Sequence, residues 1–154
     1  MADERVGDEE RLQVGHARLT LDELRARVQV VAPGVICYEE LDGQTVGGAQ
    51  VMLGQVKALA DGMDQFAVIV DLRDVPTRPS AEYREFMVEW AKGMPPFHAA
   101  YVLPPVGALT RMALRWVALR VMNVHESSSS SDHESVEDAV AHCTAMLTAD
   151  AHEA

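Results

Sequence analysis

The feature that most constrains the fold of this chain is an unbroken apolar run, FAVIV, at residues 66–70. The run is short, rich in β-branched side chains and ended by Asp71, a pattern typical of a strand covered on both faces. A polar turn with two prolines follows over residues 73–79. Ser80 comes next and is of the residue type that caps helix N-termini. The sequence therefore predicts a central strand, a loop and then a helix.

The helix predicted after Ser80 ends at Gly93 and carries one apolar face. Four large side chains recur along it at i, i+3, i+4 and i+7, namely Tyr83, Phe86, Met87 and Trp90. A loop at the carboxyl end of a buried strand is where open α/β sheets usually place their sites. The loop between this strand and this helix is therefore the first place to search for function.

The rest of the chain alternates between short strand-like and helix-like segments. Residues 28–31 and 35–40 predict a hairpin, because a Pro-Gly pair separates two β-branched runs. Residues 126–132, ESSSSSD, fit either a solvated loop or an edge strand. The remaining predicted elements are a helical turn at 21–26, a helix with apolar positions from Val46 to Ala60, a strand at 98–103, a helix at 106–122 and a last helix after Ser135.

Strands that alternate with helices predict a mostly parallel sheet, since parallel strands need crossover connections and these are helical. We expect an α/β fold with four to five strands, an N-terminal hairpin and about four helices. A chain of 154 residues has the size of one domain. The expected organisation is a flexible acidic N-terminus at 1–15, a single domain at 16–148 and a C-terminal tail at 149–154.

The formal net charge of −11 belongs mainly to the two ends of the chain. Residues 126–154 hold seven acidic residues and no lysine or arginine, whereas residues 12–125 hold twelve acids and eleven bases. Nucleic-acid binding through a basic face is therefore disfavoured. The first ten residues lack the apolar core of a signal peptide, and no long apolar run predicts a transmembrane segment. The two cysteines, Cys37 and Cys143, are scattered along the sequence, and we expect both to be buried. The absence of these targeting signals and the small number of cysteines favour a cytoplasmic protein.

Three segments resemble the STAS and SpoIIAA-like group of small bacterial domains. They are VICYEELDGQTV at 35–46, VIVDLRDVPTRPS at 68–80 and SVEDAVAHC at 135–143. The order of predicted elements matches that group over about residues 27–148. In the anti-sigma-factor-antagonist branch, the resemblance implies regulation by contact with a protein partner. In the Sec14-like branch, it implies an apolar ligand held between sheet and helix.

The resemblance also singles out Ser80 as a candidate phosphoacceptor. In the antagonist branch the second helix opens with an Asp-Ser-Ser-Gly motif whose serine is phosphorylated by a partner kinase, and Ser80 falls where that serine would be. Its neighbours here are Pro79, Ala81 and Glu82 in place of aspartate, serine and glycine. We therefore expect Ser80 to act as a helix cap.

The helix predicted at 106–122 has more apolar side chains than one buried face requires. A helical projection places Leu109, Met112 and Trp116 on the buried side, with Arg111 and Arg115 opposite. Four apolar residues are then expected to be exposed as a contact surface: Leu114, Ala118, Leu119 and Met122. The candidate partner or ligand surface comprises Arg111, Arg115, Trp116, Leu119, Arg120 and Met122.

No catalytic or metal-binding pattern is evident. Asp71 and Asp74 could form a carboxylate pair, but a turn role is favoured. The six histidines never show the i, i+4 spacing of a helical metal pair, and no Ser-His-Asp pattern, P-loop or dinucleotide fingerprint is present. We expect no enzymatic activity, no cofactor and no metal.

Two hypotheses follow. The first is a non-catalytic regulatory module that binds a protein partner, or a second copy of itself, through the helices predicted after Ser80 and at 106–122. The alternative is a binding domain for a small apolar or amphipathic ligand. It is suggested by the methionine supply, because thioethers fill adaptable apolar spaces. These methionines are Met52, Met63, Met87, Met94, Met112, Met122 and Met146.

Overall fold

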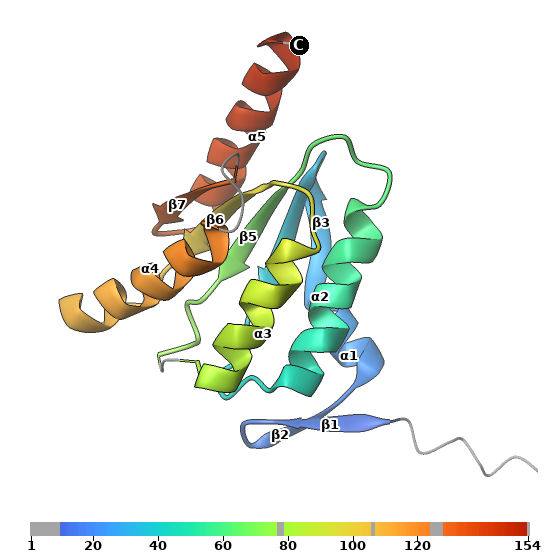
Figure 1. The fold of residues 1–154 in the computed structure, drawn as a ribbon, viewed down its shortest axis with the longest axis vertical. Helices are drawn as coiled ribbons and strands as arrows, with labels where there is room; N and C mark the ends of the chain where they lie inside the picture. The colour runs from blue at the N-terminus through green and yellow to red at the C-terminus, as the bar shows by residue number, and fades with distance from the viewer. Residues whose placement is uncertain (1–9, 77–78, 106, 124–127, 154) are drawn as a thin grey trace, which may run out of the picture.

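The chain is an α/β protein built on a five-stranded, mostly parallel sheet (Figure 1). The structure is a computed structural model and describes residues 10–76, 79–105, 107–123 and 128–153. The strands of the main sheet are β3 (Val28–Ala32), β4 (Val35–Glu39), β5 (Ala67–Asp71), β6 (His98–Val102) and β7 (Ser129–His133). They lie in the order β3-β4-β5-β6-β7, with β3 antiparallel to β4 and every other neighbouring pair parallel. The predicted hairpin, the central strand and the general α/β class with a mostly parallel sheet are confirmed, with five helices among the described residues where about four were expected. The serine-rich segment supplies an edge strand.

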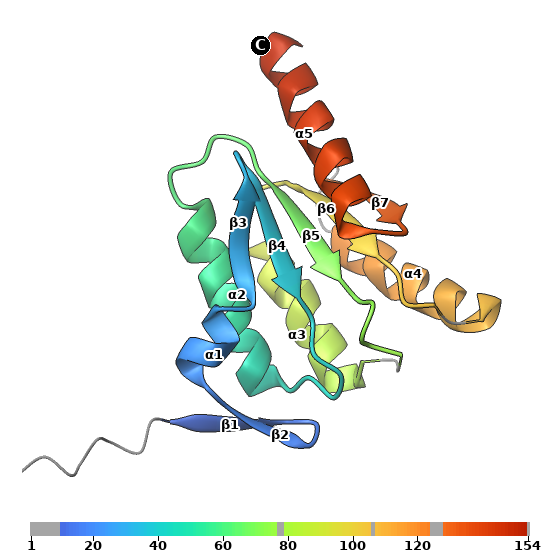
Figure 2. The same cartoon turned by 180° about the vertical axis from the view of Figure 1, so that it is seen from behind.

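The crossover helices cover one face of the sheet. They are α2 (Val46–Ala60), α3 (Ala81–Lys92) and α4 (Ala108–Met122). Because the strands follow one another in sequence order, right-handed crossovers place all three helices on the same side. The last helix, α5 (Val136–Glu153), lies on the opposite face, as the view from behind shows (Figure 2). It extends through most of the segment 149–154 that was expected to be a tail.

A small hairpin precedes the sheet and was not predicted. β1 (Arg11–Val14) pairs antiparallel with β2 (Ala17–Thr20), and α1 (Leu21–Arg25) follows at once. α1 confirms the predicted helical turn: Thr20 Oγ1 accepts a hydrogen bond from the Glu23 amide at 3.0 Å. β1 lies in the segment 1–15 that was expected to be flexible, and residues 1–9 are outside the described residues. Its four residues are half polar, so they carry little strand signal of their own.

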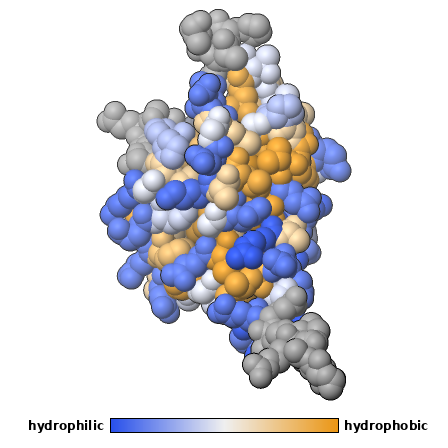
Figure 3. All heavy atoms as spheres, turned by 90° about the vertical axis from the view of Figure 1, so that its right-hand side faces the viewer, coloured by the Kyte–Doolittle hydropathy of each residue, from blue (hydrophilic) through white to orange (hydrophobic). Residues whose placement is uncertain are grey.

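The core has two parts, one on each face of the sheet. The larger part lies under α2, α3 and α4 and includes Ile36, Tyr38 and Val68. The smaller part lies under α5, where Cys37 meets Cys143 in an apolar layer. Both cysteines are buried, as expected. At the outer edge, β3 leaves Val30 and Val31 partly exposed. The side of the molecule that bears α2 and β3 accordingly shows apolar surface among charged residues (Figure 3).

α4 corrects the prediction of its buried face. Its buried residues are Leu114, Ala118, Val121 and Met122. Leu109, Met112, Trp116 and Leu119 are exposed, with Leu109 at 83% and Trp116 at 53%. The predicted orientation is therefore right for Leu119 and wrong for the other apolar residues that were assigned a side, namely Leu109, Met112, Leu114, Trp116, Ala118 and Met122. A helix with apolar residues on almost every side has no unique buried face in projection, so packing against α3 and β7 decides the orientation.

Among the described residues, no helix combines the length and apolar character needed to cross a membrane.

Candidate functional site

A cavity of about 390 Å³ lies between the end of the sheet, the loop before α2 and helices α3 and α4. Its walls include Glu40, just beyond β4, Leu72, just beyond β5, and Tyr101, near the end of β6. These positions mark the carboxyl ends of three neighbouring parallel strands. The cavity therefore lies at the edge of the sheet where α/β proteins usually place their sites.

Two helix caps fix the side chains at this edge. Ser80 Oγ accepts a hydrogen bond from the Tyr83 amide at 3.2 Å, which confirms its predicted role as the cap of α3. Thr45 Oγ1 accepts one from the Gly48 amide at 3.1 Å at the start of α2. Each cap sets where the first turn of its helix begins, so Tyr83 points inward from α3. Ser80 and Tyr83 both line the cavity.

A tight backbone approach holds the loop before α2 in place. Gly43 has φ 72°, a left-handed conformation that favours glycine, and a Cβ there would lie 2.7 Å from Gly15 Cα. The Gly15 amide donates a hydrogen bond to the Gly43 carbonyl at 3.1 Å. The β1–β2 hairpin is thereby fastened to the segment that carries Gln44, so it supports the wall of the cavity.

The polar centre of the cavity is Glu40, whose residue exposure is only 6%. Its Oε1 accepts hydrogen bonds from the Leu41 amide and from Gln44 Nε2, both at 2.9 Å. Its Oε2 accepts one from the Tyr83 hydroxyl. The hydroxyl of Tyr38, a residue that is 2% exposed, belongs to the same buried group. Three donors thus converge on one carboxyl group.

Burial dominates the electrostatics of this group. It raises the pKa of Glu40, although the hydrogen bonds from Tyr83, Leu41 and Gln44 oppose that shift. Burial also raises the pKa of Tyr38 and of Tyr83 well above the usual value, so both hydroxyls stay protonated. The Tyr83 hydroxyl donates to Glu40, whereas the Tyr38 hydroxyl has no hydrogen-bond partner among the described residues. Among the described residues, no cationic side chain forms an ion pair with Glu40; Arg27 acts on it only at longer range. A negative charge on Glu40 therefore lacks a buried counter-charge.

The other walls of the cavity are mainly apolar. They include Val70 from β5, Met87 from α3 and Leu114 and Val121 from α4. Of the methionines thought to supply a pocket, Met87 lines the cavity, while Met52 lies behind it with its sulfur 3.2 Å from Gln44 Nε2. Met112 is exposed instead. The cavity thus combines a polar centre with apolar walls.

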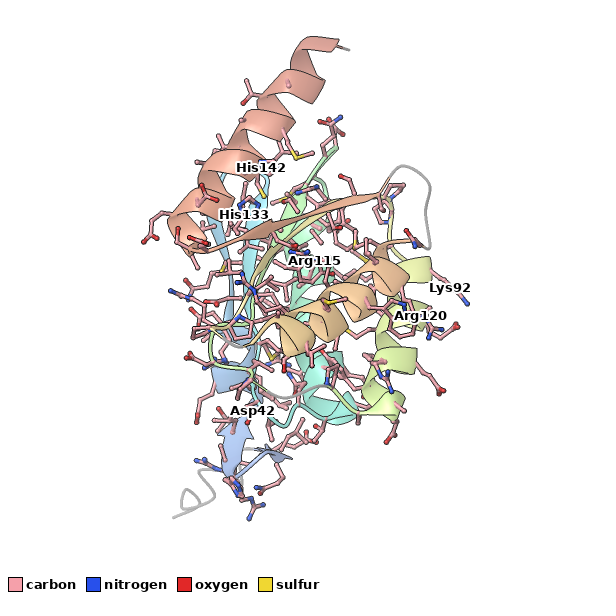
Figure 4. All side chains as sticks on the ribbon, turned by 90° about the vertical axis from the view of Figure 1, so that its left-hand side faces the viewer. Asp42, Lys92, Arg115, Arg120, His133 and His142 are labelled. Atoms are coloured by element: carbon pink, nitrogen blue, oxygen red, sulfur yellow. The ribbon has the colours of Figure 1, made fainter. Side chains whose placement is uncertain are left out.

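The structure divides the predicted partner surface of α4 between two places (Figure 4). Trp116 and Arg120 line a groove between α3 and α4, with the Arg120 guanidinium carbon 5.1 Å from the centre of the Trp116 ring. Arg111 and Arg115 line a hollow beside β7 and the start of α5, where Arg115 pairs with Asp132. Met122 is buried and cannot belong to an exposed surface.

Asp71, the last residue of β5, and Asp74 in the following turn do not act together. Arg73 binds the Asp71 carboxylate through Nε at 3.0 Å, Nη2 at 2.8 Å and its backbone amide at 3.1 Å. Burial would raise the pKa of Asp71, but these hydrogen bonds and the charge of Arg73 outweigh it and hold the pKa below its ordinary value. Asp74 is exposed. Asp71 therefore closes the turn, which is the role that the sequence favoured.

A second polar cluster, which the sequence patterns did not indicate, lies between the edge strand and α5. It joins His98 of β6, His133 of β7 and His142 of α5, with ring centres 5.3 Å apart for His98 and His142 and 4.9 Å for His133 and His142. Figure 4 shows His133 and His142 on these facing elements. Spacing along one helix could not find this histidine cluster, because its members come from three elements.

Two serines of β7 link the histidine cluster into a chain. His98 Nδ1 lies 2.7 Å from Ser129 Oγ, and His98 Nε2 lies 2.8 Å from Ser131 Oγ. Ser131 Oγ also lies 2.7 Å from His133 Nε2. His133 Nδ1 lies 2.7 Å from Asp138 Oδ2 at the start of α5.

The hydrogen-bond donors along this series of side chains can be assigned in one direction. If His133 donates from Nδ1 to Asp138, its Nε2 accepts from the Ser131 hydroxyl. His98 must then donate from Nε2 to Ser131, and its Nδ1 accepts from the Ser129 hydroxyl. Both imidazoles are neutral in this arrangement. Ser131, His133 and Asp138 thus share the contacts of a Ser-His-Asp triad, but the Ser131 hydroxyl also accepts a hydrogen bond from His98. This series of hydrogen bonds fastens β7 and α5 to the sheet.

The described residues contain no group of three or more histidine, cysteine or acidic side chains that could hold a metal ion. Comparison with known proteins found no matching family model, no matching curated protein and no matching solved structure. Support for a function therefore comes from the geometry of the cavity and of α4.

Proposed function

We propose that this protein is a non-catalytic binding domain that holds a small, amphipathic and mostly apolar ligand in the cavity between its sheet, the loop before α2 and helices α3 and α4. The observation that carries the proposal is the cavity itself. It combines apolar walls with a few convergent polar groups, one of which is a buried carboxyl with a raised pKa. Pockets of several hundred cubic ångströms with this lining are the usual form of small-molecule sites.

Packing supports the same proposal. Protein interiors are normally filled to the density of organic crystals, whereas this pocket opens to solvent and its apolar wall atoms face water. These walls include Leu114 and Val121 from α4 and Met87 from α3. A ligand with an apolar body would displace that water and pack against these residues.

Filling the cavity from within tests the proposal. Ala118 is buried on α4 and lines the cavity, so Ala118→Phe should occupy the ligand's space. Binding of the uncharged apolar dye N-phenyl-1-naphthylamine, followed by its fluorescence, should weaken by about tenfold or more. Ala113→Phe, on a partly exposed position of the same helix, is the matched control and should bind like the wild type. Equal dye binding by Ala118→Phe, with an unchanged circular dichroism spectrum, would refute the proposal.

The proposed ligand site is compatible with membership of the STAS and SpoIIAA-like group, which we also propose. The support is the order of elements from β3 to α5 and the three segments that resemble that group. Within it, the cavity favours the Sec14-like branch. Ser80 is engaged as the cap of α3, which is its expected role.

A second candidate function, regulation through a protein partner, is favoured by the exposed side of α4. Leu109, Met112, Trp116 and Leu119 are exposed there, and the helix contains three arginines and no acidic residue. Packing two copies of α4 together would bring arginines of like charge into contact, so we propose a partner with an acidic surface.

This partner can be sought with a photo-crosslinking residue at position 119. Crosslinks to one acidic protein should vanish when Trp116→Glu is added, and a crosslinker at exposed Lys57 on α2 should not capture that protein. If light scattering shows a dimer that Trp116→Glu dissociates, the partner is a second copy of the chain and the proposal of an acidic partner is wrong.

A further inference from the structure

We propose that the ligand of the cavity carries a protonated amine and that this amine pairs with Glu40. This inference rests on the proposed ligand-binding function and deepens it by naming the chemistry of the ligand's polar end. The ligand is then an amphipathic cation, with an apolar body against α3 and α4 and an ammonium group at the ends of β4 and β5.

The hydrogen bonds of Glu40 prepare it to hold a negative charge. Its carboxyl accepts from the Leu41 amide, from Gln44 Nε2 and from the Tyr83 hydroxyl. A carboxylate has about four acceptor positions, so three are occupied and one remains for a further donor.

The missing partner of that charge is a cation. Glu40 is buried, and no ion pair forms with it among the described residues. An isolated buried charge is costly, and pairing it with an opposite charge removes much of the cost. Glu40 lines a cavity with room for a ligand, so an ammonium group placed there supplies both the fourth hydrogen bond and the counter-charge.

The charged groups around Glu40 give the same result. Tyr38 of β4 and Tyr83 of α3 stay neutral because burial raises the pKa of both hydroxyls. Arg27, just before β3, is already paired with Glu39 at 3.9 Å. None of these groups neutralises Glu40 from within the site.

Among the described residues, the cavity wall holds one other charged side chain, Arg84, which would suit an anionic ligand instead. Arg84 also lines the groove between α3 and α4 that contains Glu85 and Glu89, and it is only partly buried. Its Nε atom is buried and has no hydrogen-bond partner among the described residues, so an anionic head group is the direct competitor of an ammonium group in this cavity. Glu40 is the more deeply buried of the two charged residues, which is why we place the charge of the ligand against it.

Three probes with one alkyl chain and different head groups separate these possibilities. n-Octylamine, n-octanol and n-octanoate are each used to displace N-phenyl-1-naphthylamine from the wild-type protein at neutral pH. The expected order is octylamine first, with half-displacement at a concentration about tenfold or more below that of octanol, and octanoate last. Octanoate binding more tightly than octylamine would overturn the inference and favour Arg84.

Two variants assign the preference to Glu40. Glu40→Gln keeps the size and most hydrogen bonds of the side chain and removes its charge, so octylamine and octanol should displace the dye equally well. Glu39→Gln changes the exposed neighbour and should behave as the wild type. If Glu40→Gln keeps the preference for octylamine, the inference is wrong.

A further measurement uses the wild type alone, so its result does not depend on how well a variant folds. Acid should weaken octylamine binding, because protonation of Glu40 removes the charge with which the amine pairs, while the amine itself stays protonated. Displacement of the dye should therefore need more octylamine at acid pH than at neutral pH, while displacement by octanol should not change. An octylamine affinity that is the same at both pH values would count against the inference. Failure of all three probes and of the dye would refute the binding function itself.

Discussion

Acid should weaken this fold through His98, and the size of the effect follows from its surroundings. His98 is 8% exposed, and burial, followed by the charges that His142 and His133 would carry, lowers its pKa from 6.5 to about 4. Protonation would also break the chain in which His98 Nδ1 accepts from Ser129. A histidine whose folded pKa is depressed contributes stability above its ordinary pKa and loses it as the pH falls towards the folded value.

The free energy involved is appreciable for a domain of this size. Each pKa unit corresponds to about 1.4 kcal/mol, so the shift is worth at most about 3 to 4 kcal/mol. Water reaches the exposed side chain of Asp138 at the end of the same chain and screens part of the effect. We therefore expect the folded state to lose about 2 kcal/mol between roughly pH 7 and pH 4 on account of His98.

Urea unfolding of the wild type and of His98→Gln, followed by circular dichroism at several pH values, measures this contribution. Other titrating groups, Glu40 among them, are present in both proteins and cancel in the difference. The wild type should therefore lose about 2 kcal/mol more than His98→Gln on acidification. His16→Gln, at an exposed turn, is the control and should follow the wild type. Parallel pH profiles for the wild type and His98→Gln would refute the reasoning.

Further predictions concern Glu40, Ser80 and α4. Because burial raises the pKa of Glu40, its stabilising effect is present below the ordinary pKa and is lost as the pH rises through the folded value, so Glu40→Gln should flatten that part of a thermal-denaturation profile. Ser80→Ala should cost roughly 1 kcal/mol in urea unfolding, whereas Ser80→Asp should cost little because aspartate caps about as well; a phosphate on Ser80 in cells would contradict a purely structural role. Leu114→Ala should cost about 2 to 4 kcal/mol, whereas Met112→Ala, on the exposed side of α4, should change the free energy of unfolding by about 0.5 kcal/mol or less. Equal costs at these two positions would contradict the orientation of α4.

The parts of the fold that the sequence predicts well are those set by local signals. The hairpin at β3 and β4 follows from one Pro-Gly pair between β-branched runs, and α3 follows from its cap at Ser80 and its apolar period. α4 could not be oriented in this way. Its apolar residues surround the helix, so the choice between Leu114 and Trp116 as the buried side depends on what α3 and β7 offer.

The two polar clusters differ in how far the sequence could have indicated them. Ile36 and Tyr38 lie in the core under the helices, and the period of two along a strand puts Glu40 on the same side. That alternation predicts a buried glutamate, but two adjacent glutamates at the end of a strand are more often exposed to solvent. The histidine cluster depends on β6 and β7 being neighbours, which only the strand order reveals.

The serine-rich edge strand has a consequence for how the protein behaves at high concentration. β7 closes one side of the sheet, and an outermost strand presents unpaired backbone groups that can recruit the edge of another molecule. Here the strand is only five residues long, SSSDH, and its small polar side chains offer an incoming strand almost no apolar surface. The strand's inward hydroxyls are meanwhile occupied by imidazoles. The same residues that bind the edge to its own sheet therefore make it a poor template for fibrous aggregation.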